Sequence, residues 1–343
     1  MKFFLGVVAG GIIFLISAVF SGGDFLNGSA LVKENLKRGI FEKDNTKNKI
    51  INDNFIPGIG YEYGVWLWSS PFFLKEKMTT IIDGIKIGQF NTVYLSVDDF
   101  LLVKNIDKEN YLEELYKFVK QANDSNLVVD IVAGAPEWAE PKNRWQAYKF
   151  INLLIEYNDK YPDTKIRGLQ YDIEPYLLPN YENNKKKILN NFVEFIDIVS
   201  TRFEKYPEAS LTVVLPHFYD KKQDWAPMIT YQRETLSVFD QIAKSLNKIE
   251  KGKIILMAYR NFFTGENGVD NISRVEFESI KGKTKVIIAQ ETKNISPAYV
   301  TFWELSKKNL FRQLNQIQIN YKDYENFAGV AIHDFEGFTQ LKK

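Results

Sequence analysis

Cysteine is absent from this chain, and histidine is almost absent. Without cysteine the protein has no disulfide, no thiol nucleophile and no cysteine-based zinc or iron–sulfur site. The two histidines, His217 and His333, are too few for a histidine-rich metal site. We therefore expect neither a metal ion nor a cofactor.

The chain also lacks an excess of either charge, with 44 Lys and Arg residues against 43 Asp and Glu residues. This balance argues against a global field that would attract nucleic acid or an acidic surface. Hydrophobic residues make up 45% and aromatic residues 15% of the 343 positions, enough for a large buried core. The composition favours a folded protein, and a neutral or sugar-like partner fits it better than a charged one. The partner that we expect from the whole of the sequence is a poly- or oligosaccharide.

Charge is missing altogether from residues 3–20, an apolar run that follows Lys2. Such a run is typical of a signal peptide, and it approaches the length that spans a bilayer. Residues 1–21 are thus predicted to be a signal peptide or a membrane anchor. In both cases we expect the rest of the chain to be extracytoplasmic, either secreted or tethered to the cell membrane. Residues 22–60 are polar and without a sustained period, which indicates a stem or leader.

From residue 61 to residue 343, short β-branched and aromatic runs alternate with longer amphipathic runs, the pattern of repeated β–α units. We predict eight strands, at residues 65–68, 92–97, 127–133, 167–173, 211–216, 253–259, 285–290 and 327–333. Helices are expected at residues 73–87, 108–122, 144–157, 185–203, 233–246, 271–280 and 298–321. The predicted fold class is therefore α/β, a (β/α)8 TIM barrel whose last helix is short or absent.

The stretch GLQYDIEPY, residues 168–176, places Asp172 and Glu174 two positions apart at the end of the fourth strand. Residues two apart on a strand share a face, with backbones roughly 6.5–7 Å apart. We expect both carboxyls in the barrel mouth, with Ile173 pointing to the helices. Neighbouring carboxyls push their pKa values apart, which suits glycosidic cleavage by one protonated and one ionised acid. The alternative is that both acids are solvated loop residues or helix caps.

Two short segments resemble the chitinase-type glycoside hydrolases. RGLQYDIE is similar to their fourth-strand signature D-G-x-D-x-D-x-E at Gly168, Asp172 and Glu174, and LMAYRN to their sixth-strand Met-x-Tyr-Asp/Asn element at Met257 and Tyr259. The resemblance implies that Glu174 is the acid/base and that Asp172 stabilises a substrate N-acetyl group acting as nucleophile. It also implies that Tyr259 hydrogen-bonds that group.

Several parts of the family pattern are missing. The two leading aspartates of the signature are Arg167 and Gln170 here, VDIVAGAPEW replaces the third-strand Ser-x-Gly-Gly, and VAIHDFEGF has no counterpart of the eighth-strand tryptophan. A non-catalytic carbohydrate-binding barrel is therefore one alternative to an enzyme. Another is a metal-dependent hydrolase, such as a deacetylase, that uses the side chains of Asp98, Asp99, His217 and His333.

A different catalytic pair is also available. Barrels of the large retaining glycosidase superfamily carry an acid Glu after the fourth strand and a nucleophile Glu after the seventh, and Glu174 and Glu291 stand at those places. The asparagine that usually precedes the acid is Ile173 here. Glu291 is thus a further catalytic candidate, with a cap of the short helix before Pro297 as its structural alternative.

Acidic, aromatic and imidazole side chains follow the predicted strand ends, where barrel enzymes carry their chemistry. Those that we predict to bind substrate are Trp68, Asp98, Glu137, Trp138, Tyr176, His217, His333 and Asp334. Flat aromatic faces stack on sugar rings, and polar groups bond sugar hydroxyls. Any single aromatic could instead hold its loop against the core, and either histidine could be structural. Trp66 and Trp303 are expected in the core.

Overall fold

Eight parallel strands close into a barrel in the computed structural model, which describes residues 55–70, 74, 77–102, 108–220 and 226–342. The strands follow one another around the ring in the order β1-β10-β9-β8-β5-β4-β3-β2. Their bounds are β1 Glu62–Leu67, β2 Thr92–Ser96, β3 Val128–Ala133, β4 Gly168–Tyr171, β5 Ser210–Pro216, β8 Gly252–Met257, β9 Lys285–Glu291 and β10 Phe327–His333. The predicted α/β TIM barrel is confirmed.

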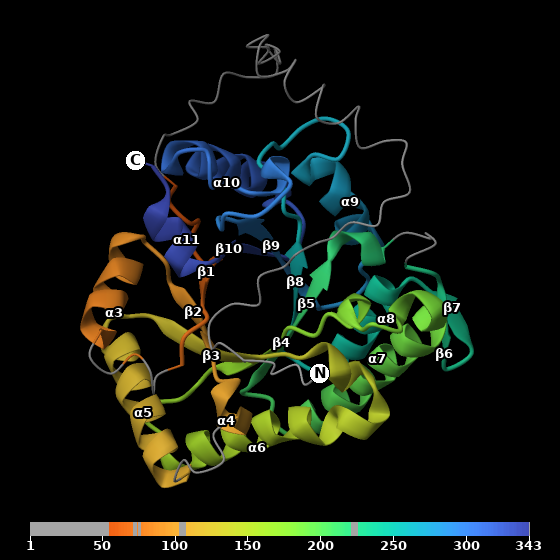
Figure 1. Ribbon diagram of the computed structural model, residues 1–343, viewed down its shortest axis with the longest axis horizontal. Helices are drawn as coiled ribbons and strands as arrows, with labels where there is room; N and C mark the ends of the chain where they lie inside the picture. Colours follow the sequence, from red (N-terminus) through yellow and green to blue (C-terminus); the bar gives the residue numbers. More distant parts are fainter. Residues whose placement is uncertain (1–54, 71–73, 75–76, 103–107, 221–225, 343) are drawn as a thin grey trace, which may run out of the picture.

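Helices surround this ring (Figure 1). They are α3 Met78–Ile87, α4 Asp99–Leu102, α5 Lys108–Asp124, α6 Arg144–Lys160, α7 Tyr181–Phe203, α8 Val238–Leu246, α9 Val269–Ser279, α10 Lys307–Tyr321 and α11 Phe335–Gln340. The last of them, α11, has six residues and packs against β1 and β10. It is the short final helix that the sequence predicts.

Two predicted helices begin later than expected. The helix placed at residues 233–246 starts at Val238, because a hairpin of β6 (Ile229–Tyr231) and β7 (Glu234–Leu236) precedes it. The turn of this hairpin places Gln232 and Arg233 at φ values of 48° and 67°, a left-handed turn made without glycine. The helix expected from residue 298 starts only at Lys307. A capping box formed by Ser306 and Asn309 marks this start.

The strand period divides the buried side chains into two layers. The layer inside the barrel consists of Trp66, Tyr94, Val132, Val214, Ile255, Ile287, Ala289 and Ala331. The other layer fills the space between the strands and the helices, and it includes Ile173. Trp66 is thus a core residue as predicted, whereas Trp303 is only partly buried.

An ionic cluster that is largely enclosed lies among the amino ends of the strands. Glu62 accepts hydrogen bonds from Arg167 Nη1 at 2.7 Å, from Lys253 Nζ at 2.8 Å and from the Tyr94 hydroxyl at 2.6 Å. Arg167 also donates from Nε to Asp130 Oδ1 at 2.9 Å. Two acids thus face two bases, so the charges cancel and each has hydrogen-bond partners.

The part of the chain before β1 is described only from residue 55. Phe55 packs edge-on against Tyr63 with ring centroids 4.8 Å apart, and Gly58 N donates to Gln318 Oε1 at 2.8 Å. The end of the predicted stem therefore packs on the barrel. The apolar run at residues 3–20 lies outside the described residues, and no helix within them is long and apolar enough to cross a membrane.

Loss of the shared acceptor in the ionic cluster should destabilise the fold. Glu62→Ala leaves Arg167 and Lys253 without their common carboxylate in a largely enclosed site, so we expect the free energy of unfolding to fall by about 3–5 kcal/mol. Urea denaturation measures this change. Glu250→Ala, which removes an exposed ion pair with Lys283, is the matched control and should leave the midpoint unchanged. Equal effects of the two substitutions would contradict the role assigned to the cluster.

Candidate active site

The strand period directs one set of side chains into the carboxyl end of the barrel. Trp66 Nε1 donates to Gln170 Oε1 at 2.7 Å, so Gln170 also faces the interior. Residues two positions beyond an inward-facing residue share its face. Asp172 lies one residue past the end of β4, yet its N–H still donates to the Ala133 carbonyl at 3.1 Å, which continues the ladder. Ile173 is fully buried in the outer layer, so it points to the helices as predicted.

His333, at the end of β10, stands at the centre of a hydrogen-bonded chain. Its Nδ1 lies 2.8 Å from Glu291 Oε2, and the indole N–H of Trp68 donates to its Nε2 at 2.9 Å. An indole N–H can only donate, so Nε2 is the acceptor and Nδ1 carries the proton that goes to Glu291. The neighbouring Glu291 raises the pKa of His333 against the effect of burial. Both ring nitrogens are therefore occupied, and the ring is held in place.

Both carboxylate oxygens of Glu291 are engaged by neighbouring groups. It is almost fully buried, and its Oε1 accepts the backbone N–H groups of Thr292 at 2.8 Å and Lys293 at 2.7 Å. With Oε2 on His333, both carboxylate oxygens have partners. This arrangement suits an orienting group better than the nucleophile of a retaining pair. Glu291 caps the turn directly after β9 rather than the helix before Pro297.

Asp172 is half-buried, and one of its carboxyl oxygens has no partner among the described residues. Within the described part of the chain, its Oδ1 is shielded from solvent and has no hydrogen-bond partner. Burial raises the pKa of Asp172 to about 6, and the nearby His333 opposes that rise. An unpaired buried carboxyl oxygen is costly, and such groups are most often found where a ligand supplies the missing donor.

Glu174 follows two residues later, at the start of the short 3₁₀ helix η3 (Pro175–Leu177). Burial first, and then the charge of Asp172, raise its pKa well above the usual range of a glutamate. The Tyr176 hydroxyl donates to Glu174 Oε1, and the Tyr176 ring packs edge-on against Phe218. The two acids found in the sequence are thus neighbours, and Glu174 holds its proton more firmly than Asp172.

Asp98 lies behind this pair, at the end of β2. Its Oδ1 accepts from Gly134 N at 3.1 Å, and burial, followed by smaller contributions that include the charge of Asp172, raises its pKa to about 7. Gly134 permits the close packing of these strand ends, because a Cβ there would come within 1.8 Å of the Asp172 carbonyl oxygen. Asp98 therefore supports the position of Asp172 through the β3 backbone.

Tyr259, two residues beyond β8, packs against the inner layer of the barrel. Its ring centroid is 6.0 Å from that of His333. Burial raises its pKa well above the usual tyrosine value, and the charges of Glu291, Asp172 and Glu174 add to this rise. The hydroxyl therefore stays protonated and can donate a hydrogen bond next to the acid pair.

Three predicted substrate-binding residues have other roles or places. Trp138 is buried against Phe150, and its N–H donates to Gln146 at 3.0 Å, so its face is closed to a sugar. Asp334 caps α11 by accepting from a backbone N–H, and it pairs with a lysine at 3.0 Å. Glu137 is exposed on the 3₁₀ helix η1 (Pro136–Ala139), and its side chain makes no ion pair within the described residues.

The metal-site alternative is not supported. Within the described part of the chain, no group of three or more acidic or histidine side chains could hold a metal ion. Asp99 accepts from the Tyr111 hydroxyl on α5 at 2.9 Å and also bonds Ser70, so it faces the outer layer. His217 has the guanidinium of Arg260 as a neighbour, with Nη2 3.4 Å from its Nε2. The four residues of that alternative do not converge.

On the rim that runs from β4 to β8, the sequence predicted Tyr176 and His217 as substrate-binding residues but missed Phe218 and Arg260. Phe218 lies between Tyr176 and His217, with ring centroids 5.4 Å and 5.7 Å away, and Arg260 stands beyond His217. The available signal was LMAYRN, where an arginine stands at the place of the acidic or amide residue of the resembling motif.

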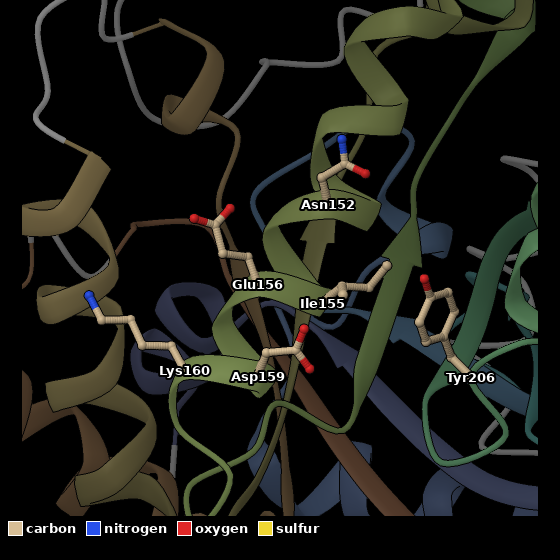
Figure 2. Close-up of a pocket in the computed structure, with 6 residues that line it drawn as sticks. All are labelled: Asn152, Ile155, Glu156, Asp159, Lys160 and Tyr206. Atoms are coloured by element: carbon tan, nitrogen blue, oxygen red, sulfur yellow. The ribbon is translucent and has the colours of Figure 1, made fainter.

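A surface pocket of about 580 Å³ lies away from these residues, between α6 and the loop after α7 (Figure 2). It is lined by Asn152, Ile155, Glu156, Asp159, Lys160 and Tyr206. All of them except Tyr206 belong to α6, whose carboxyl end leads into the amino end of β4, so the pocket is at the opposite end of the barrel. Two of its charged side chains, Glu156 and Lys160, are already in surface ion pairs.

A scan of known protein families finds no match, and no curated protein matches the sequence. Similar solved structures include the GH18 chitinase of Cycas revoluta in complex with (GlcNAc)3, at 12% identity and a TM-score of 0.49, covering 80% of this chain and 95% of that chain. The spore cortex-lytic enzyme SleL of Bacillus cereus is similar at 10% identity and a TM-score of 0.48, covering 82% and 75%. Chitinases and related glycosidases are thus among the structural neighbours of this barrel.

Replacement of Glu174 should make the protein more stable at high pH. Because burial raises the carboxyl pKa, the native state binds more protons than the unfolded state above the usual glutamate pKa, and the free energy of unfolding falls as pH rises toward the native pKa. Glu174→Gln removes this loss. We expect its melting temperature to exceed that of the parent by at least about 3 °C at pH 8, and to match it near pH 4.

Differential scanning calorimetry at a series of pH values measures this difference. Glu266→Gln, at an exposed position, is the control and should follow the parent at every pH. A Glu174→Gln variant whose melting temperature also follows the parent throughout would show that the Glu174 carboxyl is not buried in the protein.

Proposed function

We propose that this protein is a glycoside hydrolase that cleaves an extracellular polysaccharide or glycoconjugate, with Glu174 as the general acid/base and Asp172 as the stabiliser. The observation that carries the proposal is a pair of neighbouring carboxyls at the carboxyl end of the barrel, the buried Glu174 and the half-buried Asp172 with its shielded Oδ1. Burial raises both pKa values, that of Glu174 well above its usual range and that of Asp172 to about 6. One acid therefore keeps its proton while the other is ionised.

Glu174 suits the acid step. Tyr176 donates to Oε1, which leaves Oε2 to carry the proton. In the first step this proton passes to the glycosidic oxygen while the bond from that oxygen to the anomeric carbon breaks and the carbonyl oxygen of the substrate N-acetyl group bonds to that carbon. In the second step the ionised Glu174 takes a proton from the water that attacks the anomeric carbon and displaces the acetyl oxygen. One water is consumed, and Glu174 returns to its starting state.

Asp172 suits the stabilising step. Positive charge develops at the anomeric centre as the bond breaks, and an ionised carboxylate beside it lowers the energy of that state. Its buried Oδ1 has no partner within the described residues, so it can accept an N–H from the substrate. An N-acetyl group on the sugar offers such a donor, and we assign to the Tyr259 hydroxyl a hydrogen bond to the same group. Nucleophilic assistance by an N-acetyl group is therefore the mechanism that we favour.

The place of action that we propose is outside the cytoplasm. Its support is the uncharged apolar run at residues 3–20, which fits either a cleaved signal peptide or a membrane anchor. An extracytoplasmic glycosidase would meet polysaccharides and glycoconjugates of the cell surface there.

A carbohydrate-binding barrel without catalysis is the second candidate. The observation that favours it is that Arg167 and Gln170 have structural roles, in the ionic cluster and in a hydrogen bond with Trp66, where the resembling signature has aspartates. Such a protein would bind glycans and leave them intact.

Replacement of Glu174 should distinguish a glycoside hydrolase from a non-catalytic carbohydrate-binding protein. We expect Glu174→Gln to lower kcat/KM by roughly 10²–10⁴-fold while glycan binding is kept, because the amide cannot supply a proton. Release of reducing ends from N-acetylglucosamine oligosaccharides and from acidic and neutral polysaccharides measures hydrolysis, and calorimetry measures binding. Glu266→Gln serves as the active control. Binding without cleavage by the unmodified protein on every glycan tested would favour the second candidate.

The pH dependence of hydrolysis should show an acidic limb near pH 6. Below about pH 6 Asp172 becomes protonated and no longer stabilises positive charge, so kcat/KM should fall about tenfold per pH unit there. Measurement of kcat/KM from pH 4 to pH 9 tests this, and Asp172→Asn should abolish the limb together with most of the activity. A rate that keeps rising as the pH falls through 5 is inconsistent with the assigned role of Asp172.

A further inference from the structure

Arg260 is a half-buried cation at the rim of the barrel, directly after Tyr259. Its Nη1 donates to the Tyr259 carbonyl at 2.7 Å, and the guanidinium carbon lies 5.4 Å from the centroid of the Tyr299 ring. Its Nε is shielded from solvent and has no hydrogen-bond partner within the described residues. A shielded N–H donor without an acceptor is destabilising, so this position calls for an explanation.

No carboxylate compensates this charge within the described part of the chain. The ion pairs found there include no partner for Arg260, although Asp172 and Glu174 lie at the same end of the barrel. Burial lowers the pKa of Arg260, and only the contribution of Tyr299 acts in the opposite direction. The contrast is Arg167, at the other end of the barrel, which pairs with both Glu62 and Asp130. A guanidinium with a shielded N–H is normally paired, and this one is left for a partner from outside.

Arg260 lies on the same rim as the proposed acid. The guanidinium contacts His217 at the end of β5, the His217 ring lies beside Phe218, and Phe218 packs against Tyr176. Tyr176 in turn donates to Glu174. Since β8, β5 and β4 are neighbours in the ring, this line of contacts follows three adjacent strand ends. An oligosaccharide bound at Glu174 and extending along the rim would reach Arg260.

The free edge of the guanidinium fits a planar anion. Nη1 is taken by the Tyr259 carbonyl, which leaves Nε–H and the adjacent N–H of Nη2 parallel on one edge. Two parallel N–H donors match the two oxygens of a carboxylate. We propose that Arg260 forms a carboxylate subsite, so that the glycan recognised by this protein carries an acidic sugar next to the bond that is cleaved. This inference rests on the proposed function and names the substrate class for it.

The test compares binding of acidic glycans with that of their carboxyl-reduced counterparts. The probes are oligosaccharides that contain uronic acids or lactyl-substituted amino sugars, each paired with the same chain after reduction of the carboxylate to a primary alcohol. The protein used is the full chain carrying Glu174→Gln, so that no probe is cleaved. We expect the acidic member of at least one pair to bind roughly 10-fold to 100-fold more tightly than its reduced counterpart.

Two further variants in the same background assign the preference to Arg260. Arg260→Gln should abolish the preference for the acidic member and leave binding of the reduced member unchanged, whereas Arg260→Lys should keep part of it, since an ammonium is a single-point donor. Arg274→Gln removes the same charge from an exposed site on α9 and should retain the full preference. Circular dichroism and the melting temperature show that each variant is folded.

The outcomes are distinct. Equal binding of acidic and reduced glycans, or a preference that survives Arg260→Gln, overturns the carboxylate subsite while the hydrolase proposal stands. Absence of binding to every glycan, together with absence of hydrolysis by the unmodified protein, overturns both. A preference lost in Arg260→Gln and kept in Arg274→Gln supports the subsite.

Discussion

The two-residue period of the strands in a closed barrel is the constraint on which the site depends. One face of every strand must fill the interior, and the same face supplies the side chains at the carboxyl end. Trp66 and Gln170 meet inside the barrel. Trp68 and Asp172, each two residues further along the chain, must therefore also face inward. The chemistry is therefore positioned by packing. A slip of one residue in β4 would bury Ile173 among polar groups and turn both acids outward.

The two ends of the barrel shift the pKa values of their carboxyls in opposite directions. Burial raises the pKa values of Asp172, Glu174 and Asp98, and each of these shifts lowers stability as pH rises. At the amino end, Lys253 and Arg167 instead hold the pKa of Glu62 well below its usual range in spite of burial. That shift has the opposite sign, because it adds stability above the usual pKa of a glutamate. The two ends of one cylinder thus treat buried carboxyls in opposite ways.

The sequence predicted the barrel because strand and helix periods act locally, and it found Asp172 and Glu174 because their spacing is itself a strand property. It could not predict what depends on distant partners. The ionic cluster around Glu62 joins residues more than one hundred positions apart. Trp138 follows a strand end like Trp68, and only tertiary packing distinguishes the buried indole from the one at the mouth. The hairpin before α8 was missed because its turn uses Gln232 and Arg233 where glycine or asparagine is the usual signal.

The occupied hydrogen bonds of His333 limit the chemistry that the mouth can perform. A histidine that acts as general base needs a free ring nitrogen, but Trp68 and Glu291 take both. A Glu that acts as nucleophile needs an oxygen directed at the substrate, and both oxygens of Glu291 are held by His333 and two backbone N–H groups. Asp172, by contrast, has an oxygen that is unpaired within the described residues, and the pKa of Glu174 is raised well above its usual range. The hydrogen-bonded chain therefore holds His333 and Glu291 in place, which is why the proposed mechanism assigns proton transfer to Glu174 and not to these two residues.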